Sequence, residues 1–102
     1  MATQVEKTRT IDIDGEKITA RPLKIKYLKK FMTEFQKLDK VAADNVKSTD
    51  VLMGCMVVAF EQYKPEWANV ETLEDKLDLP TIYELIEISA GIKFGDDGNP
   101  NR

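Results

Sequence analysis

The sequence predicts a mainly α domain (α+β), with an N-terminal β-hairpin followed by three or four helices and a disordered C-terminal tail. Three observations lead to this prediction: an Asp-Gly pair between two β-branched runs, an amphipathic stretch after it, and a long apolar segment in the middle of the chain. A chain of 102 residues has room for one hydrophobic core. We therefore expect one compact domain over residues 1–94 and a tail over residues 95–102.

The hairpin is expected at about residues 5–20. Asp14-Gly15 separates two runs that are rich in β-branched residues. Such a pair is typical of a type I′ turn, because both central residues of that turn need a positive φ. Arg21-Pro22 ends the hairpin, since the residue before a proline favours an extended backbone.

The first helix is expected at about residues 24–43, where apolar residues recur every three or four positions. The second, at about residues 50–63, is apolar on nearly every side, which is typical of a central core helix or of a helix that a partner covers. Two shorter helices are expected at about residues 70–77 and 80–90. Gly91 is expected to end the last one, because glycine readily takes the left-handed conformation of a helix C-cap.

Two polar stretches are expected to lie outside the helices. Residues 45–50 resemble a linker, and Ser48, Thr49 and Asp50 are each suited to cap the second helix. The tail consists of turn-forming residues only, so we expect it to be disordered.

The composition argues against an enzyme. The chain has no histidine and one cysteine, so a Ser-His-Asp triad, a Cys-His pair and an imidazole metal ligand are all excluded. Cys55 lies in the most apolar segment, which is typical of a buried structural thiol. The pattern of Asp12 and Asp14 is similar to the start of a calcium loop, but the later ligand residues of such a loop are missing from the sequence. We therefore predict no catalytic residue, no metal site and no cofactor.

The two halves of the chain carry opposite charge. Residues 1–47 contain 11 Lys and Arg against 7 Asp and Glu, giving +4, whereas residues 48–102 contain 4 against 11, giving −7. The basic stretch at 21–40 could be a nucleic-acid surface, but a solvated helix face explains it better, because no aromatic residues alternate with its lysines. Self-association, with the basic half of one copy against the acidic half of the next, is a further hypothesis.

The beginning of the chain has no apolar signal segment, and the longest apolar run, residues 51–60, is shorter than a membrane span. We therefore expect a cytoplasmic protein with no membrane partner.

The order of these pieces resembles a known family. An Ile-Asp-Ile-Asp-Gly-Glu-Lys-Ile hairpin, a Lys-rich helix and an apolar helix precede the segment at residues 73–92, in which Leu79-Pro80 is followed by Tyr83-Glu84. An Asp-Gly-Asn-Pro-Asn tail ends the pattern. The chain resembles the small tail assembly chaperones of long-tailed bacteriophages and prophages of Gram-positive hosts.

The resemblance implies a non-enzymatic, mostly helical protein in the cytoplasm of the infected host. Such a protein binds and solubilises the tape measure protein, helps to recruit tail-tube subunits, and is absent from the mature virion. Self-association of the chain into a ring or a filament would suit the coating of a long partner.

Five residues are the candidates for binding this partner. Methionine repacks easily against varied apolar surfaces, so Met53 and Met56 are either partner contacts or ordinary core residues. Tyr63, Trp67 and Phe94 flank helix breaks and are expected to be exposed anchors. On this hypothesis, Trp67→Ala leaves thermal stability nearly unchanged.

Two other functions compete with the chaperone. One is a different small structural component of the phage, such as a connector or a tail-completion protein. The other is a small DNA-binding regulatory protein that uses the basic helix at residues 21–40.

Overall fold

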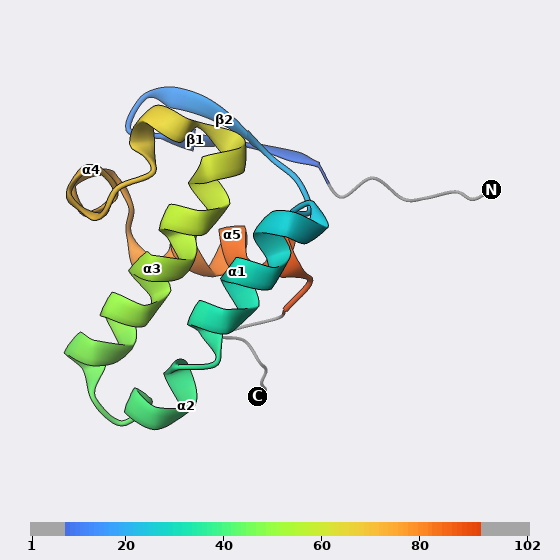
Figure 1. Cartoon of the computed structure of the whole chain (residues 1–102). Coiled ribbons are helices and arrows are strands. Elements are labelled where there is room, and N and C mark those ends of the chain that lie inside the picture. The colour runs from blue at the N-terminus through green and yellow to red at the C-terminus, as the bar shows by residue number, and fades with distance from the viewer. Residues whose placement is uncertain (1–7, 93–102) are drawn as a thin grey trace, which may run out of the picture.

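The computed structural model describes residues 8–92, and it confirms a mainly α fold with an N-terminal hairpin (Figure 1). The expected tail and Phe94 lie outside these residues. The strands are β1 (Arg9–Ile13) and β2 (Glu16–Ala20). The helices are α1 (Ile25–Phe35), α2 (Leu38–Val41), α3 (Asn45–Tyr63), the 3-10 helix η1 (Pro65–Trp67), α4 (Val70–Lys76) and α5 (Leu79–Ala90).

The hairpin has the predicted turn. The strands pair antiparallel with Ile13 opposite Glu16, which leaves Asp14 and Gly15 as the two loop residues. Their φ angles are 55° and 84°, so both take the left-handed conformation that the Asp-Gly pair allows. The side chain of Asp12 accepts a hydrogen bond of 3.1 Å from the backbone N–H of Gly15. The pairing begins at Arg9, within the expected range of residues 5–20.

The predicted helix at residues 24–43 is wrong in its length, because it is interrupted after Phe35. The backbone N–H groups of Lys37 and Lys40 donate to the carbonyls three positions earlier, those of Glu34 and Lys37. This tighter pattern breaks the four-residue ladder, and a single turn, α2, follows. The apolar stripe nevertheless continues, since Leu38 still packs against the core.

The start of the second helix was also predicted wrongly, because residues 45–50 form the first turns of α3 instead of a linker. The cap is Asp44, whose Oδ1 accepts a 3.0 Å hydrogen bond from the backbone N–H of Lys47. The hydroxyls of Ser48 and Thr49 donate to the carbonyl of Asn45. The two hydroxyls are compatible with a helix because they form local hydrogen bonds to its backbone.

The last two helices begin and end where local signals place them. Asn69 caps α4 and Asp78 caps α5, each accepting a 2.9 Å hydrogen bond from a backbone N–H three residues later. Hydrogen bonds from the side chain and the backbone N–H of Thr81 stabilise the charged form of Asp78 and lower its pKa. Gly91 ends α5 with a φ of 72°, as predicted.

The central helix α3 organises the core. In Figure 1, α1 runs beside α3, the hairpin crosses the C-terminal end of α3, and α4 lies on the side of α3 away from α1. The inward side chains of these elements form one apolar cluster. Its largest fully buried members include Phe31, Met56, Phe60, Leu73 and Leu85.

Candidate partner-binding site

The two candidate methionines are core residues. Met53 and Met56 lie in the middle of α3, and both side chains are buried in the apolar cluster. Of the two interpretations of these residues, the structure supports ordinary core. A partner that docks on the folded domain cannot reach either thioether.

Trp67 is buried, and the expectation that it is an exposed anchor is wrong. Only 7% of the residue is accessible. The short helix η1 turns the chain back, so that the indole stacks on Phe60 with ring centroids 6.0 Å apart. The ammonium groups of Lys64 and Lys76 lie 5.4 and 4.6 Å from the centroid of the indole ring. The bend after α3 therefore buries its tryptophan beneath two lysines.

Tyr63 is half-buried and links the end of the hairpin to α5 through hydrogen bonds. Its hydroxyl donates a 2.6 Å hydrogen bond to the carbonyl of Arg21 and lies 2.6 Å from the hydroxyl of Ser89. Burial raises the pKa of Tyr63, which favours the neutral phenol that these contacts require. Tyr63 therefore connects the end of the hairpin to α5. Its contacts are intramolecular, in contrast to the exposed anchor that was expected.

Gln62 and Ser89 also bind the segment that follows the hairpin. Neither residue was identified from the sequence. The side-chain amide of Gln62 accepts from the backbone N–H of Lys24 at 2.9 Å and donates to the carbonyl of Pro22 at 3.2 Å. The backbone N–H of Leu23 donates to the carbonyl of Ser89. No local signal marks these residues, because the partners in each pair are far apart in the sequence.

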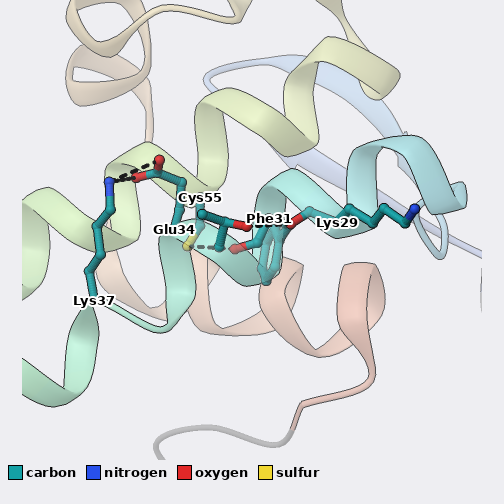
Figure 2. A network of polar contacts seen from close by, with 6 residues as sticks. Lys29, Phe31, Glu34, Lys37 and Cys55 are labelled. Carbon is teal, nitrogen blue, oxygen red and sulfur yellow. Dashed lines mark hydrogen bonds and ion pairs between the residues drawn. The ribbon is translucent and has the colours of Figure 1, made fainter.

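Cys55 is a buried thiol between α1 and α3. Figure 2 shows its sulfur facing the carbonyl of Phe31, at 3.9 Å. Burial raises the pKa of Cys55 to about 12, and the nearby carboxylate of Glu34 acts in the same direction. A thiol with this pKa is almost fully protonated near neutral pH, so it is a poor nucleophile.

We expect the native protein to become less stable as the pH rises from 9 to 12, partly because of Cys55. The unfolded thiol loses its proton near its ordinary pKa of 9.0, whereas the folded thiol keeps it until about pH 12. The free energy of unfolding therefore falls by up to roughly 1.4 kcal/mol per pH unit in this window. Urea unfolding of the wild type and of Cys55→Ala at several pH values measures the difference. Equal slopes for the two proteins would contradict this account.

An apolar groove remains as the best candidate for contact with a partner. It has a volume of about 340 Å³ and lies where α2, the first turns of α3 and the start of α5 meet. Its lining residues are Leu38, Ala42, Asn45, Ser48, Thr49, Leu52, Leu79 and Tyr83. Leu79 is 40% exposed, which is unusual for a large apolar side chain in this domain. Val46, beside the groove residue Asn45, is 72% exposed.

The four-residue spacing of helices explains why these side chains line one groove. Leu38 and Ala42 are four residues apart, and so are Leu79 and Tyr83, so each pair lies along one helix face. The cap at Asp78 fixes the first turn of α5 and thereby places Leu79 at the rim. The Leu-Pro start of α5 was noted in the sequence, but its position opposite α2 depends on the tertiary fold.

Two other hollows are less suited to an apolar partner. The larger, of about 530 Å³, lies on α4 and is lined mainly by charged side chains, including Glu71, Glu74 and Lys76. Another, of about 360 Å³, adjoins Gly91, where the chain continues outside the described residues.

Within residues 8–92, no group of three histidine, cysteine or acidic side chains is placed to hold a metal ion. Among the helices in that part of the chain, none has both the length and the apolar character that a membrane span requires. Comparisons with protein families, with curated proteins and with solved structures find no match for this chain.

Proposed function

We propose that the chain is a non-enzymatic tail assembly chaperone of a long-tailed phage or prophage. In this proposal it binds and solubilises the tape measure protein in the host cytoplasm, helps to recruit tail-tube subunits, and is absent from the mature virion. The support from the sequence is the resemblance described above, particularly the segment at residues 73–92. The observation that carries the proposal is the apolar groove between α2, α3 and α5.

The groove suits the apolar face of an amphipathic helix. Grooves of this kind receive side chains that recur every three or four residues along a partner helix. The lining offers apolar contacts from Leu38, Leu52 and Leu79 and also includes the polar side chains of Asn45 and Ser48. A holding protein needs such a surface, because apolar helix faces of a long, incompletely assembled partner aggregate when they are exposed.

We expect Leu79→Glu to weaken the solubilisation of the tape measure protein. The substitution places a charge at the rim of the groove, and a carboxylate is tolerated in the first turn of a helix. The test is to co-express the tape measure protein of the same phage with the wild-type chain or the variant, and to measure its soluble fraction. We expect the wild type to raise this fraction severalfold and Leu79→Glu to abolish most of the gain.

Thr10→Glu provides the control. Thr10 is exposed on β1, so the substitution also adds a surface carboxylate, but it lies outside the groove and outside α1 and α4. This control should solubilise the partner as well as the wild type does. Equal effects of the two variants would remove the groove from the site, whereas no effect of the wild-type chain would contradict the chaperone function itself. Stoichiometric amounts of the chain in purified particles would favour a structural component instead.

A further inference from the structure

Two surface helices, α1 and α4, begin with the same pattern of apolar and charged positions, but the charges are positive on α1 and negative on α4. Each starts with a β-branched apolar residue and carries charged residues at its second, fifth and sixth positions. We call the two sets the basic ridge and the acidic ridge. The basic ridge on α1 consists of Ile25, Lys26, Lys29 and Lys30. The acidic ridge on α4 consists of Val70, Glu71, Glu74 and Asp75. Helical spacing places the members of each set on one side of their helix.

Both ridges are open to solvent. All eight residues are exposed, including the apolar Ile25 at 64% and Val70 at 45%. Lys30 forms an ion pair of 3.3 Å with Glu61 on α3. The other five charged side chains have no ion-pair partner among residues 8–92. Figure 2 shows the side chain of Lys29 extending away from the contacts of Cys55 and Glu34.

A single copy of the chain does not bring the two ridges together. In Figure 1, α1 and α4 lie on opposite sides of α3. The ion pairs of the described residues include none between α1 and α4. The folded molecule therefore presents a positive ridge on one side and a negative ridge on the other. The charge difference between the two halves of the sequence thus becomes a charge difference between two sides of the folded molecule.

We propose that the basic ridge of one copy binds the acidic ridge of a second copy. In this contact Ile25 of one molecule meets Val70 of the other, and the lysines around Ile25 pair with the carboxylates around Val70. Each ridge places one apolar residue beside three like charges, so an apolar contact and opposite-charge pairs can form at one interface. Charge complementarity of this kind favours the correct encounter and excludes like-charged pairings.

The contact is heterologous, because it joins two different surfaces. A bound pair keeps one free ridge of each sign, acidic on one copy and basic on the other, so further copies can add to form a ring or a filament. The inference holds whether or not the partner is a tape measure protein. If it is, a row of copies would present many identical grooves to one long chain, which raises the overall affinity for that chain.

A charge-swap experiment on the full chain tests this inference. The first variant, Lys26→Glu with Lys29→Glu, makes both ridges acidic, and the second, Glu71→Lys with Glu74→Lys, makes both basic. We expect the wild type to gain mass with concentration in light scattering at low salt, and to lose this gain at high salt. Each variant alone should self-associate with an affinity at least about tenfold lower than that of the wild type. An equimolar mixture should recover association, because each variant then meets a ridge of opposite charge.

Lys40→Glu with Lys47→Glu is the matched control for the first variant, since it changes the net charge by the same amount at exposed lysines outside both ridges. It should associate like the wild type. Circular dichroism verifies that all variants are folded. A wild type that stays monomeric at low salt, ridge variants that associate normally, or a mixture that does not recover would each overturn the proposal. None of these results depends on the solubilisation assay, so this inference and the proposed function can fail separately.

Discussion

Replacing Trp67 by alanine is expected to lower the free energy of unfolding by about 3–5 kcal/mol. The indole is 7% exposed and stacks on Phe60, which is itself fully buried. The substitution removes this packing and also the aromatic face that lies beneath Lys64 and Lys76. A loss of this size is a large fraction of the stability of a small domain. The structure therefore reverses the sequence-based expectation that Trp67→Ala is neutral for stability.

Urea unfolding followed by circular dichroism is the appropriate measurement. Trp67 is the only tryptophan of the chain, so tryptophan fluorescence cannot be used to follow the alanine variant. Trp67→Phe is the companion variant, because it keeps an aromatic ring in contact with Phe60 and should lose less than half as much stability. Equal unfolding midpoints for the wild type and Trp67→Ala would show that the indole is not packed as described.

Met56→Ala is expected to lower the free energy of unfolding by about 2–5 kcal/mol. Met56 is fully buried on α3, in the core that the helices and the hairpin share. Truncation leaves a cavity that the surrounding side chains fill only in part. Met56→Leu, which nearly conserves the volume, should cost less than about 1.5 kcal/mol.

Val46→Ala is a control on the same helix. Val46 is 72% exposed in the first turn of α3, so its truncation should change the free energy of unfolding by no more than about 0.5 kcal/mol. Thermal and urea unfolding of the three variants would measure the contrast. If Met56→Ala were as stable as the wild type, the assignment of Met56 to the core would be wrong, and its role as a partner contact would regain support.

Features decided by neighbouring residues were predictable. The turn at Asp14 and Gly15 was predicted because it depends on the φ angles that those two residues tolerate. The end of α5 was predictable for the same reason, since Gly91 takes the left-handed conformation at the cap. The apolar character of the middle of α3 likewise indicated its place in the core.

Features decided by distant residues were not predictable. The exposure expected for Trp67 followed from its place at a helix break, whereas its burial depends on how η1 returns to Phe60 and on the two lysines above it. The groove needs α2 near the start of α5, although Leu38 and Leu79 are far apart in the sequence. The early start of α3 at Asn45, after its cap Asp44, was missed because several neighbouring polar residues are also good caps.

The sequence by itself determined the order and type of the main elements, the turn of the hairpin, the glycine cap of the last helix, and the opposite charge of its two halves. These properties depend on backbone preferences and on side-chain periodicity over a few residues, which a single sequence contains. Only the tertiary structure decided which aromatic residues are covered, where an apolar groove opens, and that the basic and acidic ridges lie on opposite sides of α3. Burial and surface complementarity depend on contacts between segments far apart in the chain, and no local pattern determines those contacts.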